Sequence, residues 1–296
     1  MLFTPSSLSY KIETDITTLT IVKPAWMELD GGQYFFVNIP EISLSEWHPL
    51  SHSGSLNGDI VFRVKNQAHS PHNSSLRRVF AIGAAQSNST FVSCWTGHLA
   101  TIAEKMQFQE IPMPMVRLHG PFGYAPFLEF DMLLLFAGGI GITPFMSVII
   151  DIYSAISQGK PIPTKQVSLV WMAQETELFR MYEDVYEAIS DLQKSFEAPM
   201  FFINLFCTRS PAPIQSSGAI QEDGISVKTL RPGIPLATGN GIALNYGRCK
   251  FEEMFTKFSR SGSTLAAVCG PPMLVQEVSH LARLFECEFH SEEFTF

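Results

Sequence analysis

The chain has 296 residues, of which 46% are hydrophobic and 24 are Phe, and its formal net charge at pH 7 is −8. This length suits one large domain or two ordinary ones, and the apolar content allows a substantial core. An acidic chain without a basic tract is a poor nucleic-acid binder, so we expect no nucleic-acid partner.

The five cysteines are scattered, odd in number and without Cys-x-x-Cys spacing. This usage is typical of a reducing compartment, and it predicts neither a disulfide framework nor a metal site. The first ten residues, MLFTPSSLSY, lack a charged segment followed by an apolar one. No signal peptide is therefore expected.

Short β-type runs separated by Gly, Pro and Asn fill the first part of the chain, up to about Tyr124. The predicted strands are Leu19–Val22, Tyr34–Ile39, Asp59–Lys65, Arg78–Ile82 and Met115–Leu118. This rhythm is typical of an antiparallel barrel or sandwich. The polar stretch between Asn66 and Ser93 predicts an insertion loop with room for one extra strand.

The segment from Asp131 to Ile150, DMLLLFAGGIGITPFMSVII, predicts a strand, a glycine turn and a helix. Its apolar run is typical of a parallel strand covered on both faces. Thr143 is expected to cap the helix with its hydroxyl, and Pro144 suits the first helical position. A glycine turn that opens a helix leaves free N–H groups, which bind phosphate.

Two other interpretations of this segment stay open. It is nearly long enough to span a membrane, although a Gly-Gly pair and a Thr-Pro pair at mid-span favour a strand, a turn and a helix. The other alternative is that the glycines serve only a tight turn. Pro144 stands where the ordinary dinucleotide fingerprint has its third glycine, so the match to that fingerprint is incomplete.

The remainder of the chain alternates strands and helices, which predicts a parallel sheet with helices on both faces. The strands are expected at Leu133–Phe136, Val167–Trp171, Met200–Phe206 and Thr264–Cys269. One helix is expected over Leu178, Tyr182, Val185, Ile189 and Leu192, another over Met273–Leu284, and a long loop over Ser210–Asn245 with room for one short strand. The predicted domains are 1–127 and 128–296.

Several short motifs follow in a fixed order. They are GQYFF (from Gly32), HPLS (His48 to Ser51), WT (Trp95, Thr96), GPFG (Gly120 to Gly123), AGGIGITPF (Ala137 to Phe145), YGR (Tyr246 to Arg248), CGP (Cys269 to Pro271) and the terminal FHSEEFTF. Each motif is weak alone. Together they resemble the dehydrogenase module of NADPH oxidases and ferric-chelate reductases, within the ferredoxin–NADP reductase superfamily. The resemblance covers nearly the whole chain.

This resemblance implies a six-stranded antiparallel Greek-key barrel that binds FAD, followed by a doubly wound parallel-sheet domain that binds NADPH. In the barrel, Ser51 matches a hydroxyl near the reactive flavin nitrogen, and His48 and Pro49 help to hold the cofactor. Leu50 stands where an aromatic residue usually stacks beneath the ring. Arg63 matches a basic residue that neutralises FAD phosphate, with a solvated strand residue as the alternative. Trp95 and Thr96 precede a helix whose N-terminus could take the same group.

In the nucleotide domain, the resemblance implies a pyrophosphate site at Gly138, Gly139, Gly141, Thr143 and Pro144. Thr208, Arg209 and Arg248 match the part that recognises a 2′-phosphate, for which the planar guanidinium is well suited. No acidic residue closely follows the third strand, as recognition of a free 2′-hydroxyl would require. We therefore expect NADPH in preference to NADH.

The chain's last third also supplies residues for the nicotinamide and the flavin. Cys269, Gly270 and Pro271 resemble the loop that sets the nicotinamide near flavin, although Cys269 could equally be a buried thiol at a strand end. Phe296 is expected to shield the outer flavin face, with Phe294 as the alternative. Glu292 and Glu293 could tune the flavin or exchange protons, or be merely solvated.

The resemblance further implies the course of the electrons. They pass from NADPH to FAD and then singly to heme in a transmembrane domain that is absent here, either upstream in the same chain or in a partner. The module then lies on the cytoplasmic side of a membrane. Ferric iron is the preferred acceptor, a superoxide-producing oxidase is the close alternative, and a non-catalytic nucleotide-binding regulatory module is the alternative of another class.

Overall fold

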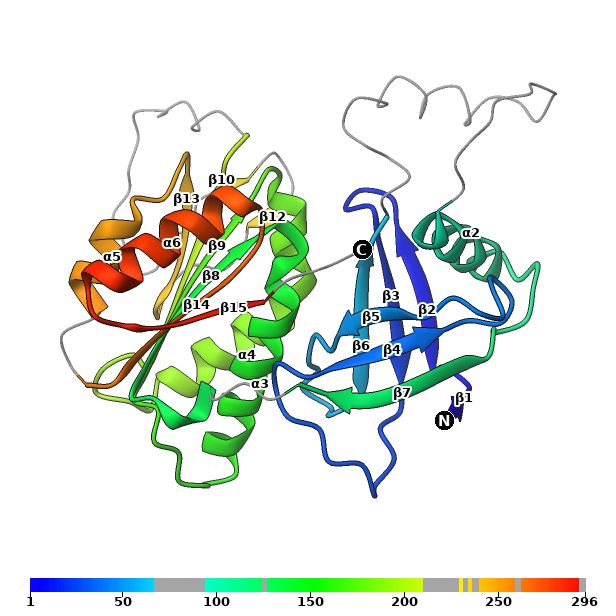
Figure 1. Cartoon of the computed structure of the whole chain (residues 1–296), viewed down its shortest axis with the longest axis horizontal. Helices are drawn as coiled ribbons and strands as arrows, with labels where there is room; N and C mark the ends of the chain where they lie inside the picture. The colour runs from blue at the N-terminus through cyan, green and yellow to red at the C-terminus, as the bar shows by residue number, and fades with distance from the viewer. Residues whose placement is uncertain are drawn as a thin grey trace. The chain divides into compact units, whose positions relative to one another are not determined.

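The structure, a computed structural model, describes residues 1–66, 94–123, 127–209, 229–230, 234–235, 240–258 and 262–292 (Figure 1). Among them the chain forms two compact units. Unit 1 comprises 1–27, 34–51 and 59–121, and unit 2 comprises 28–33, 52–58 and 122–296. Two short segments from the first part of the sequence thus group with unit 2. The functional domains 1–127 and 128–296 stay a prediction.

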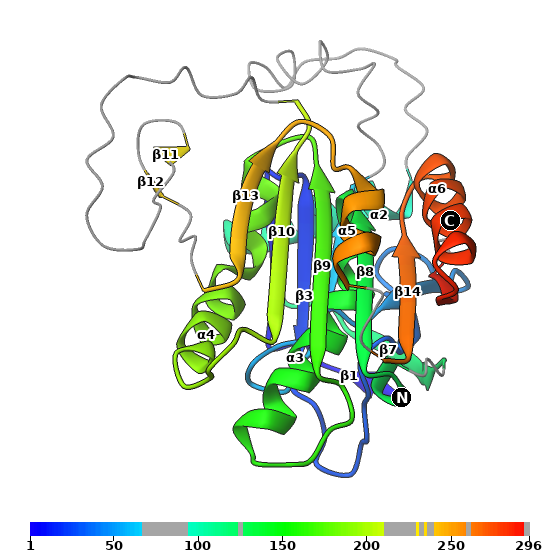
Figure 2. The ribbon, with the colours of Figure 1, turned by 90° about the vertical axis from the view of Figure 1, so that its left-hand side faces the viewer.

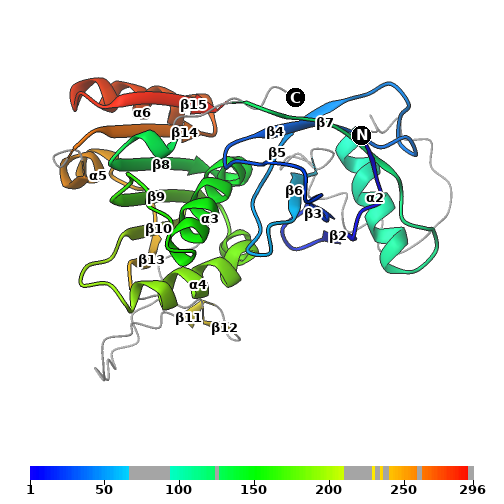
Figure 3. The ribbon, with the colours of Figure 1, turned by 90° about the horizontal axis from the view of Figure 1, so that it is seen from below.

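Unit 1 contains two antiparallel sheets. The four-stranded sheet has the order β1-β7-β4-β5 and the three-stranded sheet the order β2-β3-β6, seen as two layers in Figure 3. The strands are β1 (Leu2–Phe3), β2 (Ser7–Lys11), β3 (Ile16–Ile21), β4 (Tyr34–Asn38), β5 (His48–Ser51), β6 (Ile60–Lys65) and β7 (Val116–Phe122). The buried rings of Phe35 in β4 and Phe62 in β6 meet edge to face at 5.8 Å, so the core lies between the sheets.

The antiparallel architecture of this half is confirmed, and β3, β4, β6 and β7 lie close to predicted strands. The predictions missed β1, β2 and β5. β1 has two residues, β2 is largely polar, and β5 contains Pro49, so none shows the length and alternation that indicate a strand. The strand predicted at Arg78–Ile82 lies outside the described residues. Helix α2 (Trp95–Gln107) packs beside β2.

Unit 2 is built on a six-stranded parallel sheet of order β13-β10-β9-β8-β14-β15. Figure 2 shows β13, β10, β9, β8 and β14 side by side. The strands are β8 (Met132–Gly138), β9 (Gln166–Ala173), β10 (Phe201–Cys207), β13 (Ile242–Tyr246), β14 (Thr264–Cys269) and β15 (Glu288–Glu292). Residues of β8 and β14 are almost completely buried, as expected for strands covered on both faces. The predicted doubly wound sheet is confirmed.

Helices cover both faces of this sheet. α5 (Phe251–Phe258) and α6 (Pro272–Leu284) pack on one face with Phe136, Val170 and Val268. α3 (Thr143–Ser157) lies behind the sheet in the view of Figure 2, in which α5 lies in front. The helix predicted over residues 178–192 is only partly correct, because 176–182 form a 3₁₀ segment, η4, and α4 spans Glu183–Gln193.

The long loop predicted over Ser210–Asn245 contains more structure than one short strand. β13 begins at Ile242, inside this range, and a two-stranded hairpin of β11 (Thr229–Leu230) and β12 (Ile234–Pro235) precedes it. Predictions for the other residues of 210–239 lie outside the described part of the chain. β13 has only five residues and follows Asn240–Gly241, so its apolar signal is short.

In the described part of the chain, one helical segment, Gly139–Ser157, is long and apolar enough by composition to cross a membrane. Within unit 2 it packs as a core helix, because 61% of its apolar window is buried inside the structure. The burial pattern therefore favours the predicted strand, turn and helix over a spanning helix.

A buried carboxylate on α3 binds one of the two segments that group with unit 2. The backbone N–H of Gly31 donates to Asp151, and the N–H of Gly32 donates to Ser147 Oγ at 2.9 Å. Burial, aided by the nearby charge of Asp30, raises the pKa of Asp151 to about 6, although the Gly31 hydrogen bond opposes the shift. The folded environment of Asp151 thus disfavours the charged form of its carboxyl group.

We expect Asp151→Asn to change how stability depends on pH. Because the pKa is raised on folding, the free energy of unfolding falls as the pH rises from about 4 to about 6, and the penalty persists above that range. A pKa shift of about two units corresponds to about 3 kcal/mol. Above about pH 7, the free energy of unfolding of the variant should therefore exceed that of the wild type by up to that amount. The asparagine oxygen can still accept from Gly31.

Urea unfolding between about pH 4 and about pH 8 measures this difference. The control is Asp191→Asn on the exposed face of α4, whose ion pair with Lys194 at 2.7 Å is a surface pair. An Asp151→Asn curve parallel to the wild-type curve over the whole range would contradict the assignment.

Candidate functional site

The carboxyl ends of the parallel strands in unit 2 form the first candidate site. β8 lies between β9 and β14, and the order of the strands reverses there. The register pairs Ala137 with Cys269 and Gly138 with Met172, so these strands end at one edge of the sheet. In open α/β sheets, ligands bind outside the carboxyl ends of strands at such a reversal.

Two glycines of the turn at this edge, Gly139 and Gly141, have different surroundings. A Cβ built on Gly141 would lie 2.5 Å from the carbonyl oxygen of Cys269, so Gly141 allows the turn to pack against the end of β14. Gly139 instead has φ +58° with nothing within 4 Å of a built Cβ, and its carbonyl accepts from Trp171 Nε1 at 2.8 Å. Of these two, only Gly139 borders open space.

The predicted hydroxyl cap of α3 is wrong. A 3₁₀ segment, η3 (Gly139–Ile142), runs directly into the helix, which places Ile142 at the N-cap and Thr143 inside the first turn. The Thr143 hydroxyl donates back to the carbonyl of Ile140 at 3.3 Å. Thr143 and Pro144 are buried, so their side chains shape the turn.

Two arginines occupy equivalent positions after neighbouring strands. Cys207 at the end of β10 pairs with Tyr246 at the end of β13, and Arg209 and Arg248 each follow two residues later. The N–H of Gly247 donates to the Cys207 carbonyl at 2.9 Å, which ties the two strand ends together. Both arginines are exposed. Thr208 donates from both N and Oγ1 to the Ala173 carbonyl.

Cys269 ends β14 beside the glycine turn, and Gly270 and Pro271 follow it. Its side chain is completely buried. Burial, followed by the negative charge of Glu292, raises the pKa of the Cys269 thiol, so the group stays protonated. Burial likewise raises the pKa of Cys249 to about 12 and that of Cys287. Phe294 and Phe296 lie outside the described residues.

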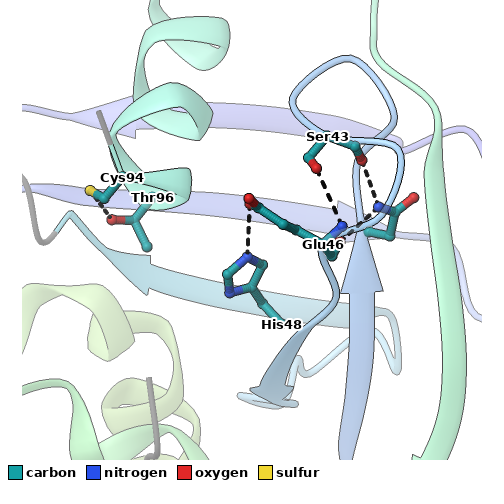
Figure 4. A network of polar contacts seen from close by, with 6 residues as sticks. Ser43, Glu46, His48, Cys94 and Thr96 are labelled. Atoms are coloured by element: carbon teal, nitrogen blue, oxygen red, sulfur yellow. Dashed lines mark hydrogen bonds and ion pairs between the residues drawn. The ribbon is translucent and has the colours of Figure 1, made fainter. Parts of the chain in front are cut away.

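The second candidate site lies in unit 1, where β5 meets the start of α2 (Figure 4). The rings of His48 and Trp95 stack with centroids 4.3 Å apart. Trp95 is buried, and its Nε1 has no hydrogen-bond partner among the described residues. The Cys94 side chain makes no capping bond to α2. A buried donor beside an uncapped helix N-terminus suits an anionic group.

His48 itself is held by the loop that precedes it. Glu46 Oε2 lies 3.7 Å from His48 Nε2, within ion-pair range when the imidazole is protonated but too long for a hydrogen bond. The buried amide of Asn38 donates to the carbonyls of Ser43 and Glu46, both at 2.7 Å. Sequence reasoning missed Asn38 and Glu46, because their contacts depend on how the loop folds.

The other residues predicted to hold flavin lie on β5, β6 and α2 of unit 1. Ser51 is half-buried and pairs with Tyr34 across β4 and β5, and Leu50 is 5% exposed and pairs with Phe35. Arg63 is half-buried in β6 opposite Thr18. Thr96 is buried in the first turn of α2, where its hydroxyl lies 3.2 Å from Cys94 Sγ. Their roles toward a cofactor stay predictions.

Comparisons with known proteins agree with this architecture. Residues 130–283, more than half of the chain, match the family described as the ferric reductase NAD binding domain, and residues 6–125 match a family of FAD-binding domains. Respiratory burst oxidase homolog protein B of Solanum tuberosum is 23% identical over 304 residues, which cover 95% of this chain and 34% of that protein. For NADPH oxidase 1 of Rattus norvegicus the identity is 24%, covering 86% of this chain and 40% of that protein.

Solved structures share the fold. The cytochrome b5 reductase domain of Ulva prolifera nitrate reductase superposes with a TM-score of 0.59 at 13% identity, covering 98% of this chain and 96% of that one. A ferredoxin NADP⁺ reductase from Neisseria gonorrhoeae, solved with FAD and NADP, gives 0.57 at 13% identity, covering 100% and 98%. The chain therefore belongs to the ferric reductase and NADPH oxidase family of dehydrogenase domains, with an FAD-binding part followed by a nicotinamide-nucleotide-binding part.

Proposed function

We propose that this chain is an NADPH dehydrogenase module that transfers hydride from NADPH to FAD. The observation that carries the proposal is the strand-order reversal at β8 and β14, where an open glycine turn lies beside Cys269. Dinucleotides bind at such reversals because helix N-termini and glycine turns accept the pyrophosphate there.

The residues of unit 2 fit NADPH. The open position at Gly139 leaves room at the turn for the pyrophosphate. Arg209 and Arg248, exposed at the ends of β10 and β13, are suited to the 2′-phosphate. The buried, uncharged Cys269 puts no charge at the end of β14, where the nicotinamide ring is proposed to lie. A Cβ on Gly270 would lie 3.1 Å from the Gly138 nitrogen, so Gly270 lets this loop pack against the glycine turn.

The residues of unit 1 fit FAD. Trp95 Nε1 and the uncapped start of α2 offer unused donors to the phosphates, with His48 stacked against them. The hydroxyl of Ser51 is the proposed partner of the reactive flavin nitrogen. Leu50 offers less ring contact than an aromatic residue would, so we expect the isolated chain to release FAD readily.

The chemistry requires little from the side chains. When bound, FAD supplies a two-electron acceptor that can pass electrons on singly. The protein's own residues bind the two cofactors, orient them and exclude water. No side-chain acid or base is needed for hydride transfer itself. Phe296 is proposed to cover the flavin, with Phe294 as the alternative.

The chain spans 34% of the length of the Solanum tuberosum oxidase and 40% of the rat oxidase. The final acceptor of the electrons is therefore a proposal that rests on these relatives. We propose heme in a transmembrane domain, with the module on the cytoplasmic side and ferric iron as the terminal substrate. The respiratory burst oxidase and NADPH oxidase relatives favour superoxide formation as the second candidate. Ferric-chelate reduction compared with superoxide yield in the full-length protein separates the two.

Anaerobic mixing of the FAD-saturated chain with NADPH tests the proposed function. We expect the flavin absorbance near 450 nm to bleach, at a rate that saturates with NADPH. The same mixture without protein measures the background reaction. If saturating FAD and NADPH both bind but no bleaching exceeds that background, the chain is a nucleotide-binding regulatory module.

A further inference from the structure

Near the carboxyl ends of β14 and β15, one face of the sheet carries Cys269, His290 and Glu292. The register places His290 opposite Ala267 and Glu292 opposite Cys269. Residues two apart on a strand point to the same face, so His290 and Glu292 share a face with Cys269. α6 covers the opposite face, because Val268 packs with Leu274 and Val278.

The contacts of His290 hold its ring from two sides. His290 Nε2 lies 2.7 Å from Glu292 Oε1, and both side chains are largely buried, at 28% and 26% exposure. The ring of buried Phe127 meets the imidazole edge to face, with centroids 5.6 Å apart. A short hydrogen bond and a packed ring together fix the position of the Glu292 carboxylate.

The charge of this pair depends on the imidazole. A neutral imidazole donates one N–H and leaves the pair at −1, whereas a protonated imidazole makes the pair neutral. The other titratable groups on the elements packed here are Cys269 of β14, Glu129 of the 3₁₀ turn η2 (Phe127–Glu129), Glu288 on β15 itself, and Glu277, His280 and Arg283 of α6, which covers the opposite face. The Cys269 thiol stays uncharged. Among the described residues, His290 is the group hydrogen-bonded to Glu292 that can cancel its charge.

We propose that His290 is a positioning residue that holds Glu292 beside Cys269. When His290 gains a proton, the preference of this edge for the positively charged ring of NADP⁺ over a neutral ring weakens. A negative charge next to the nicotinamide favours the pyridinium form. The inference rests on the proposed function, because it requires the nicotinamide to lie at Cys269.

Binding of three ligands to the FAD-saturated chain tests this proposal by titration calorimetry. NADP⁺ carries a charged ring, 1,4,5,6-tetrahydro-NADP carries a neutral ring that donates no hydride, and 2′,5′-ADP carries no nicotinamide. The measured quantity is the ratio of the Kd for tetrahydro-NADP to the Kd for NADP⁺. NADP⁺ and tetrahydro-NADP carry the same phosphates. Titration of the phosphates therefore affects the two Kd values equally and cancels in their ratio.

We expect this ratio to fall about fivefold in the wild type as the pH is lowered from about 8 to about 5.5. Glu292→Gln should show the low ratio at every pH. His290→Gln keeps an N–H donor that does not titrate, so it should retain the high ratio and lose the pH dependence. His290→Phe keeps a ring against Phe127 without a donor, and its ratio should fall even at about pH 8.

Glu288→Gln is the matched control, since it removes an exposed carboxylate from the same face of β15 and should leave the ratio unchanged. A ratio in His290→Gln that still falls with pH as in the wild type would overturn the role of His290, even if His290→Phe fails to fold. Binding of NADP⁺ and 2′,5′-ADP with no effect of Glu292→Gln would also overturn it, while leaving the proposed function standing. If neither NADP⁺ nor 2′,5′-ADP binds the wild type, the result would instead contradict the proposed function.

Discussion

Gly141→Ala is expected to lower the free energy of unfolding by about 3 kcal/mol and to abolish NADPH-dependent flavin bleaching. The new Cβ would lie 2.5 Å from the Cys269 oxygen and 2.9 Å from the Cys269 carbonyl carbon. Those are backbone atoms at the end of a buried central strand, so they cannot rotate away. The turn and the end of β14 would have to separate, which disrupts the nucleotide edge. Urea unfolding and the bleaching rate measure the two effects.

Gly139→Ala, two residues away, is the matched control. Its Cβ meets nothing within 4 Å, so the cost comes only from the left-handed φ of +58°. That strain amounts to about 1 kcal/mol for a residue with a Cβ. Equal destabilisation of the two variants would contradict the difference in packing between these glycines.

Loss of both Arg209 and Arg248 should remove the preference for NADPH. Each charge-assisted contact with the 2′-phosphate contributes about 1.5 to 3 kcal/mol, so each single alanine variant should raise the KM for NADPH roughly tenfold to a hundredfold. The KM for NADH, which lacks this phosphate, should change little. The measurement is the ratio of kcat/KM for the two nucleotides in Arg209→Ala, Arg248→Ala and the double variant.

Arg283→Ala provides the comparison on the same unit. Arg283 is an exposed arginine in the last turn of α6, which begins at the carboxyl end of β14 and runs back along the sheet. Its removal changes the net charge equally and should leave the ratio unchanged. If neither Arg209→Ala nor Arg248→Ala changes the ratio, the 2′-phosphate is bound elsewhere.

Four strands of the parallel sheet, β8, β9, β10 and β14, were predictable because burial on both faces requires continuous apolar runs. β14 spans the predicted residues, and the prediction for β8 differs only at its ends. The cap at Thr143 was mispredicted because a local motif cannot reveal that a 3₁₀ turn enters the helix. β15 was missed since FHSEEFTF reads as a polar tail, although parallel pairing with β14 makes part of it a strand.

In the candidate sites, too, some residues could be named from the sequence, whereas other contacts depend on the fold. Arg209 and Arg248 were named from the family resemblance, and both follow neighbouring strand ends, although the sequence predicted a loop with room for one short strand where β13 begins. The stack of His48 on Trp95 joins residues far apart in the chain, and no periodicity indicates it. The His290–Glu292 pair has the spacing of neighbours on one strand face, but that spacing is informative only once β15 is known.

The buried thiols have a consequence for chemical durability. Alkylating agents and peroxides attack the sulfur anion, and a raised pKa leaves almost none of that anion at neutral pH. Cys249, with its pKa near 12, and the fully enclosed Cys269 should therefore resist sulfenic acid formation. A protein proposed to handle electrons close to oxygen would keep these two sulfur atoms reduced without any dedicated protection.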